Sequence, residues 1–339
     1  MTSPNTYAAA GVDINAGQRA VDLMSKAVRA TYGPEVLAGI GAFGGLFDAA
    51  RLKTMDAPVL VASTDGVGTK TKVAARLGRW DTIGRDLVNH CINDILVQGA
   101  EPLFFMDYVA SSCLDAEQIA TVVQGVAAAC LAARCALLGG ETAEMPGVYE
   151  PNEIDLAGTI IGVVERSRIV DGKSIVPGDV ILGLPSTGLH TNGFSLARRV
   201  LGDLDWNSLL DEKTSIGDAL LAVHQSYLTP VRQLWAAGIH IKGMAHITGG
   251  GFVDNLPRIL PAGIGAVIER GTWPVLPIFK LIKRTGQIDM DEMFHVFNMG
   301  LGMLLVISPE EAPQATASLG SGMYQIGHTI AGNREVSIK

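Results

Sequence analysis

The apolar positions of this chain follow two different spacings. In residues 15–31, apolar side chains recur at the spacing of one helix face, at Ala20, Val21, Met24, Ala27 and Val28. Residues 58–63 instead form a short, valine-rich apolar run, which is typical of a buried strand. The chain therefore mixes helices with strands from its first sixty residues onward.

The same two spacings alternate through the rest of the first half. We expect a helix, a strand, a helix and two strands, at residues 82–98, 103–109, 115–134, 136–138 and 154–165. Asp115 has the N-cap position of the second of these helices, and Gln118 stands at its capping-box position. The second strand of this series leads into a glycine pair.

A turn-rich stretch at residues 171–179 divides the chain. The second half opens with a strand at 180–184, and strands and helices then alternate up to a last strand at 335–338. We therefore predict two domains, at residues 1–170 and 171–339, of the α+β (mixed α/β) class.

Composition agrees with this division and excludes several classes of protein. A chain of 339 residues is longer than one core usually serves, and 48% hydrophobic with 18% charged residues argues against disorder. The formal net charge of -8 disfavours nucleic acid and membrane surfaces as partners. Residues 1–10 lack a basic, apolar signal sequence, and no run of about 18 apolar residues suggests a membrane span. We expect a cytoplasmic protein whose four cysteines are buried, reduced thiols.

The strongest chemical signal is the sequence Asp-Gly-Val-Gly-Thr-Lys at residues 65–70, directly after the valine-rich strand. A strand end can hold the Asp65 carboxylate rigidly, and Gly66 and Gly68 let the backbone approach a ligand closely. Lys70 can reach a phosphate oxygen. This combination suits Mg²⁺ with a triphosphate, although an exposed turn with a solvated lysine is the alternative.

Two further segments supply carboxylates. Asn93 and Asp94 lie in the predicted helix between apolar residues, where an unpaired polar side chain would be costly, so a metal ion or a polar neighbour should satisfy them. Asp86 and His90 precede Asp94 on the same helix face. Glu141 follows the glycine pair at a predicted strand end, where α/β proteins often bind ligands.

In the second half, two loops join a strand to a helix and are rich in Gly, Ser, Thr and Asn, at residues 186–193 and 247–252. Exposed N–H groups at helix starts bind anions, so we predict phosphate or substrate contacts from Asn192, Gly193, Thr248, Gly249, Gly250 and Gly251. A mobile surface turn is the alternative for the three consecutive glycines. His190 and His246 flank these loops, and each is either structural or catalytic.

Two glycine patterns resemble nucleotide motifs without completing them. Gly39, Gly41 and Gly44 have the spacing of a dinucleotide fingerprint, but the strand that should precede them is missing. We interpret this stretch as a flexible loop over phosphates or a plain linker. Residues 172–174 end like a Walker A loop, but Ser167 replaces its first glycine, so we predict a turn.

Taken together, these motifs resemble the phosphoribosylformylglycinamidine cyclo-ligase (aminoimidazole ribonucleotide synthetase) family. The resemblance keeps its order over almost the whole chain, at residues 10–14, 34–36, 41–46, 64–70, 93–94, 98–105, 139–147, 186–193, 248–252 and 297–303. The long runs make it specific, whereas no single motif would.

The resemblance implies a carbon–nitrogen ligase of purine biosynthesis, which converts formylglycinamidine ribonucleotide and ATP to aminoimidazole ribonucleotide, ADP and phosphate. It implies an ATP- and metal-binding N-terminal domain, which pairs with a second copy in a shared β-barrel, and an ATP site between the domains. Nucleotide contacts would come from Lys26, Gly41, Gly44, Gly45, Asp65, Gly66, Gly68, Thr69 and Lys70. Mg²⁺ would bind to Asp65, Asp94 and Glu141. The catalytic residues would be His190, Lys70 and Asp94, with His190 acting as an acid/base or as a charge stabiliser.

Rival hypotheses remain within and outside this superfamily. A selenophosphate synthetase would usually carry a reactive Cys in the N-terminal glycine loop, which has none here, and a hydrogenase-maturation kinase is the other relative. A nucleotide-binding regulator would bind ATP without substrate-dependent ADP release. A nicotinamide dehydrogenase would instead quench cofactor fluorescence.

Overall fold

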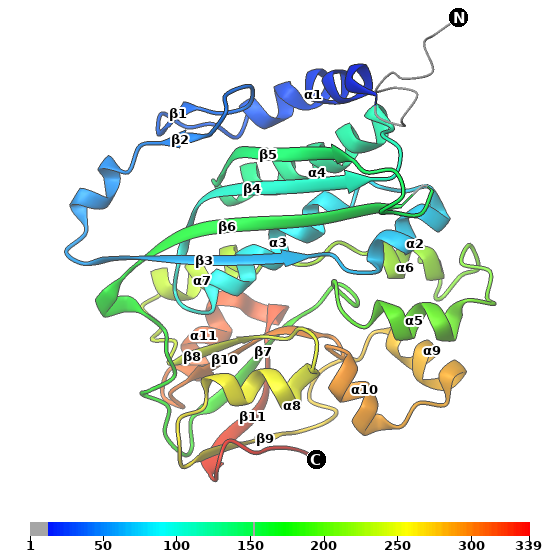
Figure 1. The fold of residues 1–339 in the computed structure, drawn as a ribbon. Coiled ribbons are helices and arrows are strands. Elements are labelled where there is room, and N and C mark those ends of the chain that lie inside the picture. Colours follow the sequence, from blue (N-terminus) through cyan, green and yellow to red (C-terminus); the bar gives the residue numbers. More distant parts are fainter. Residues whose placement is uncertain (1–12, 152) are drawn as a thin grey trace, which may run out of the picture. The chain divides into compact units, whose positions relative to one another are not determined.

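The computed structural model describes residues 13–151 and 153–339, and the chain divides into two compact units (Figure 1). Unit 1 comprises the residues up to Ile95 together with Ala100–Ser167, and unit 2 comprises Leu96–Gly99 and Arg168–Lys339. Each unit has its own sheet and its own helices. The mixed α/β class predicted from the sequence is confirmed.

Unit 1 is built on a four-stranded sheet in the order β3-β6-β4-β5. The strands are β3 (Pro58–Gly66), β4 (Glu101–Ser111), β5 (Ala136–Glu144) and β6 (Ile154–Glu165). β6 is antiparallel to both neighbours, whereas β4 and β5 are parallel. A two-stranded sheet is formed by β1 (Val36–Ala38) and β2 (Leu46–Phe47), and a 3₁₀ turn follows at Ala50–Thr54.

Four helices complete unit 1: α1 (Ile14–Arg29), α2 (Lys70–Leu77), α3 (Ile83–Leu96) and α4 (Ala116–Ala133). In Figure 1, α3 and α4 lie on one side of the sheet. They cross closely at Gly84, where an added Cβ would lie 2.0 Å from the Val122 carbonyl oxygen. Asp115 caps α4 by accepting from the Gln118 N–H, as its position predicted. Among the described helices, only α4 is long and apolar enough to cross a membrane, and 61% of it is buried within the protein.

The predicted strand at 136–138 proved too short. β5 continues through Gly139, Gly140 and Glu141 because its backbone pairs with β4 as far as Glu144. Ladder hydrogen bonding outweighs the low strand propensity of two glycines. Glu141 therefore lies within a strand, and the expectation that it follows a strand end was wrong.

Unit 2 is built on a six-stranded sheet in the order β12-β9-β11-β7-β10-β8, in which only β12 and β9 are parallel. Its strands are β7 (Val180–Pro185), β8 (Gly243–His246), β9 (Ile264–Ile268), β10 (Leu301–Ile307), β11 (Tyr324–Ala331) and β12 (Val336–Ile338). Every residue of β10 is buried, so this strand lies at the centre of the core of unit 2.

The helices of unit 2 are short and connect these strands. They are α5 (Phe194–Leu201), α6 (Ile216–Leu221), α7 (Leu228–Ala236), α8 (Gly251–Asn255), α9 (Pro277–Gly286), α10 (Met290–Val296) and α11 (Ala312–Leu319). Further 3₁₀ turns lie at Arg166–Arg168, Leu256–Ile259 and Gly320–Gly322.

The segment that resembled a Walker A loop is a structural turn. Gly172 has φ +74° and packs so closely that an added Cβ would lie 1.9 Å from the Ile259 carbonyl oxygen. Its N–H donates to the Lys242 carbonyl, and the Lys242 ammonium lies 2.6 Å from the buried Asp179 carboxylate. The segment is therefore tied to β8 and leaves no cradle for a phosphate.

The dinucleotide-like glycines also have a structural explanation. A short strand, β1, does precede Gly39, contrary to the expectation from sequence, but it runs through the loop into β2 and not into a helix. The helix start on which a dinucleotide's pyrophosphate would rest is therefore absent from this segment.

Candidate active site

The structure brings two of the predicted metal ligands together in unit 1. Asp65 lies near the end of β3, and His90 and Asp94 lie one turn apart on α3. Their ligand atoms all lie within 4.8 Å of one another. His90 Nε2 is 2.7 Å from Asp65 Oδ2 and 3.5 Å from Asp94 Oδ2, and the Ser63 hydroxyl donates to Asp94 Oδ2 at 3.2 Å.

The charges of this cluster act on its histidine. Burial works to lower the pKa of His90, but the hydrogen bond to Asp65 and the negative charges of Asp94 and other nearby carboxylates outweigh it, so the pKa is raised. The side chain of His90 is 4% exposed, against 45% for Asp65. The two carboxylates are therefore held around a nearly buried imidazole and open to solvent on the Asp65 side.

Lys70 has a different environment from the one its motif suggested. It begins α2 and forms an ion pair with Asp86, with 2.9 Å between Nζ and Oδ2 and both side chains 0% exposed. Burial lowers the pKa of Lys70, and the charge and hydrogen bond of Asp86 oppose this shift. The pair keeps both charges compensated in the interior. The predicted contact of Lys70 with a phosphate stays a prediction.

The remaining residues of the 65–70 segment form a compact turn before α2. Asp65 Oδ1 accepts from the Gly66 N–H at 2.6 Å, and Gly68 has φ +55°. Thr69 occupies the N-cap position of α2 without a side-chain cap hydrogen bond. An added Cβ at Gly66 would lie 3.0 Å from the Leu156 carbonyl oxygen, so close packing against β6 also favours a glycine here.

A cavity of about 1290 Å³ lies within unit 1, and it is lined by α1, the glycine loop, β4 and β5. Gly41 and Gly44 border open space, whereas Gly45 packs against Leu138. Phe43, at the tip of the loop, is fully exposed. Lys26 is exposed on α1 and is outside the described lining of this cavity. The loop thus borders a space large enough for a ligand, while its predicted role in phosphate binding stays a prediction.

Glu141 lies apart from the cluster that contains Asp65. It lines the cavity from β5, and β3 and β5 are the two edges of the four-stranded sheet. Three inter-strand spacings of about 4.8 Å separate these edges. In the described part of the chain, Glu141 is accordingly outside the group formed by Asp65, His90 and Asp94.

Asp107 is a residue that the sequence analysis missed. It lies on β4 beside the cavity, opposite Gly140, whose added Cβ would lie 2.1 Å from Asp107 Oδ1. Burial raises the pKa of Asp107 to about 7. The signal in the sequence is an aspartate within an otherwise apolar strand, which needs a partner or a ligand.

In unit 2, the predicted loop 186–193 is held by Asn298. The Asn298 side chain accepts from the Ser186 hydroxyl at 2.9 Å and donates to the Gly188 carbonyl at 2.9 Å. His190 adopts φ 62° and is 1% exposed. Its Nε2 accepts from the N–H groups of Thr187 and Gln225, both at 3.4 Å, which assigns the ring proton to Nδ1. This position is structurally constrained, and the predicted catalytic role of His190 stays a prediction.

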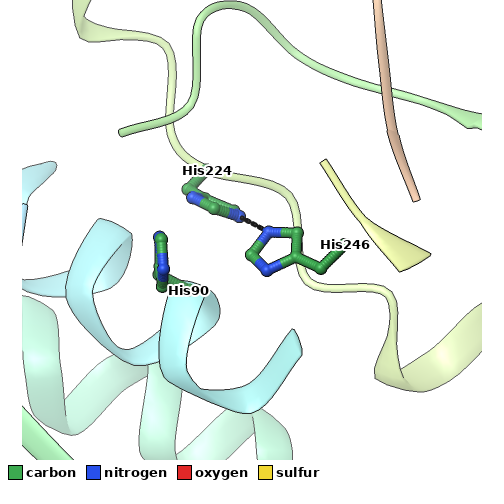
Figure 2. Close-up of side chains that lie close together, drawn as sticks. All are labelled: His90, His224 and His246. Atoms are coloured by element: carbon green, nitrogen blue, oxygen red, sulfur yellow. Dashed lines mark hydrogen bonds between the residues drawn. The ribbon is translucent and has the colours of Figure 1, made fainter. Parts of the chain in front are cut away.

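A buried pair of histidines lies beside this loop. His224 Nε2 and His246 Nε2 form a hydrogen bond, the dashed line in Figure 2, with 3.1 Å between the nitrogens. Thr191 Oγ1 is 3.3 Å from His224 Nδ1. The ring of His190 stacks on that of His224 with centroids 4.0 Å apart. The sequence analysis singled out His246 but not His224, because no local pattern marks an isolated histidine in a loop.

The second glycine loop is held by Asn255, whose Nδ2 donates to the carbonyls of Thr248, Gly249 and Gly251. An added Cβ at Gly249 would lie 3.4 Å from Asn192 Oδ1, so the structure brings the two predicted substrate loops together. Gly193, the N-cap of α5, has φ 79°.

Packing explains much of the glycine run. An added Cβ at Gly251 would lie 1.9 Å from the Phe294 carbonyl oxygen, and one at Gly250, which has φ +91°, would meet the Asp254 side chain at 2.5 Å. α8 has only five residues, so its macrodipole is weak. Of the three glycines, Gly249 has the most room for a side chain.

The fold and these loops define an AIR synthase related protein. Residues 47–164 match the N-terminal domain of that family, and residues 176–339 match its C-terminal domain. The chain is 51% identical over 334 residues to the phosphoribosylformylglycinamidine cyclo-ligase of Geobacillus thermodenitrificans (strain NG80-2), with 96% of both chains covered. It is 50% identical over 341 residues to that of Anaeromyxobacter sp. (strain Fw109-5), with 98% of both covered. The chain belongs to the phosphoribosylformylglycinamidine cyclo-ligase family, which confirms the predicted resemblance.

Solved structures share the fold at lower identity. Thiamine-monophosphate kinase from Stenotrophomonas maltophilia K279a superposes with a TM-score of 0.68 at 17% identity, covering 94% of this chain and 96% of the kinase. The hydrogenase maturation protein HypE in complex with ATP gives a TM-score of 0.67 at 19% identity, covering 93% of this chain and 86% of HypE.

Proposed function

We propose that this chain is an ATP-dependent ligase that closes the imidazole ring of aminoimidazole ribonucleotide from formylglycinamidine ribonucleotide, with release of ADP and phosphate, in purine biosynthesis. The observation that carries the proposal is 51% identity to a phosphoribosylformylglycinamidine cyclo-ligase over 96% of both chains. A protein of similar fold that is solved in complex with ATP is consistent with ATP as the co-substrate.

The chemistry requires activation of an amide oxygen, which is a poor leaving group. Transfer of the γ-phosphoryl group from ATP to this oxygen releases ADP. A nitrogen of the same substrate then attacks the activated carbon, and the carbon–oxygen bond breaks to release phosphate. Because both centres belong to one molecule, positioning supplies much of the rate.

The metal that this reaction needs fits the residues of unit 1. Asp65 and Asp94 offer two carboxylates within 4.8 Å of each other beside a glycine-rich turn, a donor set that suits a divalent cation with bound phosphate oxygens. A divalent cation held there, Mg²⁺ in the simplest case, would offset negative charge on the transferring phosphoryl group. Ser63 orients Asp94 by donating to its carboxylate.

The loops of unit 2 are proposed to bind the substrate's phosphate through backbone N–H groups near Asn192, Gly193 and Gly249. Asn298 and Asn255 hold the two loops in one conformation, so little backbone freedom remains to be lost on binding. His190, constrained by two backbone N–H groups, is proposed as a polar group that faces the reacting amide.

The deciding experiment is a coupled ADP-release assay with formylglycinamidine ribonucleotide supplied or omitted. Release of ADP only when the substrate is present, with aminoimidazole ribonucleotide as product, supports the proposal. ADP release that does not depend on the substrate would instead support a kinase of another specificity. ATP binding without turnover would support a nucleotide-binding regulator.

We further propose that the enzyme is a cytoplasmic homodimer that pairs through unit 1. Large apolar side chains are exposed on its sheet, with Leu60 on β3 61% exposed and Met106 on β4 38% exposed. A second copy of the sheet would cover them. All four cysteines are free thiols, and Cys113 is exposed, contrary to the expectation that all four are buried.

A further inference from the structure

The cluster of Asp65, His90 and Asp94 contains a nitrogen donor that the proposed Mg²⁺ site does not use. Mg²⁺ binds oxygen ligands almost without exception, whereas imidazole is a preferred ligand of first-row transition metals. His90 lies outside the runs that carry the family resemblance, and the proposed reaction does not by itself call for a histidine here. We therefore infer the role of His90 from its distances to the two carboxylates.

The distances fit a shared coordination sphere. Ligand atoms at bond lengths of about 2.1–2.2 Å around an octahedral ion lie about 3 Å apart when they are neighbours. His90 Nε2 lies 2.7 Å from Asp65 Oδ2 and 3.5 Å from Asp94 Oδ2, which bracket this value. His90 Nε2 can therefore share an ion with either carboxylate after shifts of a few tenths of an ångström, and all three ligand atoms lie within 4.8 Å of one another.

The donors are also held in place. His90 and Asp94 are four residues apart on α3, so their side chains share one face of a rigid helix. Val88 and Cys91, which lie within two residues of His90 on α3, are 0% exposed, and the histidine side chain itself is 4% exposed. The ring is shielded from solvent, and its Nε2 lies towards the two carboxylates at the distances given above. Ser63 fixes the second of these carboxylates by a hydrogen bond.

We propose that His90 is a direct metal ligand, so that this chain has an Asp–His–Asp site that prefers a transition-metal dication, with Mn²⁺ as the probe, over Mg²⁺. The proposal rests on the metal role that the proposed function gives to Asp65 and Asp94. Two carboxylates and one imidazole leave further coordination positions for water and phosphate oxygens. Mn²⁺ accepts both donor types in this geometry, whereas Mg²⁺ would have to give up an oxygen ligand for a nitrogen.

The test is pulsed electron paramagnetic resonance on the whole purified chain with one equivalent of Mn²⁺, without ATP or substrate. The expected result is an electron spin-echo modulation from a directly bonded ¹⁴N, which changes to that of ¹⁵N when the protein is made with ¹⁵N-histidine. His90→Gln, which can still hydrogen-bond to Asp65, should abolish the modulation and lower Mn²⁺ affinity roughly 10–100-fold, with a much smaller effect on Mg²⁺.

His240→Gln is the matched control, because His240 is exposed in unit 2 and plays no part in the proposed site. It should keep both the modulation and the affinity. Mn²⁺ bound to the wild-type chain without a nitrogen signal would overturn the proposal, as would a signal that survives in folded His90→Gln. The isotope change shows that the nitrogen ligand is a histidine, and His90→Asn repeats the assignment to His90 if His90→Gln fails to fold.

The outcome separates this inference from the proposed function. Substrate-dependent ADP release with Mg²⁺ and no Mn²⁺–nitrogen signal would leave the function intact and refute His90 as a ligand. A nitrogen signal in a chain that releases no ADP with the substrate would support His90 as a ligand and refute the proposed function.

Discussion

At the residue scale, the site was predicted unevenly from the sequence. Asp65 and Asp94 could be picked out because each is a carboxylate beside an apolar segment, and the structure brings them together around His90. Lys70 shows the limit of motif reasoning, since its partner Asp86 is sixteen residues away and only the fold places the two in contact. Asp107 and His224 were missed because burial and long-range neighbours give them their importance.

Asp65→Asn and Asp94→Asn test the metal site most directly. Each change removes a negative charge but keeps the side-chain volume, so substrate-dependent ADP release should fall by about two to four orders of magnitude. The melting temperature should change little, because Asp65 is 45% exposed and Asp94 is 24% exposed. Wild-type turnover in both variants at low Mg²⁺ would refute their assignment as ligands.

Asp107 should make stability depend on pH. Its pKa is raised to about 7 in the folded chain, above the ordinary value for aspartate. The folded state therefore holds the proton more tightly than the unfolded chain, and stability falls as pH rises from about 4 to 7.

Asp107→Asn removes the loss of stability that comes with ionising Asp107. The free energy of unfolding of the variant, relative to wild type, should rise by about 1 kcal/mol between pH 6 and pH 8, or roughly 2–4 °C in melting temperature. Asp203→Asn, at an exposed carboxylate, is the charge-matched control. Its free energy of unfolding relative to wild type should not change between pH 6 and pH 8. A constant difference between Asp107→Asn and wild type across this range would contradict a raised pKa at Asp107.

At the scale of elements, the hydrophobic pattern predicted helices and strands well where one face is buried. The strand Ile154–Glu165 has the predicted bounds because its inward positions alternate with outward ones. β5 was cut short at Gly139 because local propensity carries no information about its pairing with β4. The glycine run before α8 was likewise interpreted as a ligand loop. Close contact with α10, however, explains why at least Gly251 has to be a glycine.

Two glycine-to-alanine variants can separate the packing role of this glycine run from its proposed role in ligand binding. Gly251→Ala places a Cβ 1.9 Å from the Phe294 carbonyl oxygen and should lower stability by about 1–3 kcal/mol. Gly249→Ala meets only Asn192 Oδ1, at 3.4 Å, so the fold should tolerate it.

The effect of Gly249→Ala should instead appear in ligand binding. The added methyl group lies where backbone would face the substrate phosphate, so KM for the ribonucleotide should rise about 10–100-fold with an unchanged melting temperature. Steady-state kinetics beside thermal unfolding make the measurement. Unchanged kinetic constants in Gly249→Ala would mean that the loop is a structural turn only.

At the scale of the whole molecule, the sheet of unit 1 exposes large apolar side chains. Leu60 stands on β3 with 61% of its surface exposed, Met106 stands on β4, and the cavity beside the sheet is lined largely by apolar residues. An exposed apolar sheet is a surface that a second copy can bury. The sequence predicted this pairing through the family resemblance and through strands, such as residues 154–164, that one small domain would leave uncovered.

Sedimentation at micromolar concentration should therefore give twice the mass of one chain. Leu60→Glu places a charge on the proposed interface and should produce a folded monomer, because burying an unpaired carboxylate costs several kcal/mol. Leu209→Glu is the matched control, since Leu209 is 70% exposed in unit 2 and outside the proposed interface. A dimer that survives Leu60→Glu would place the interface elsewhere. A wild-type chain that sediments as a fully active monomer would show that unit 1 binds no second copy and that this apolar surface has another use.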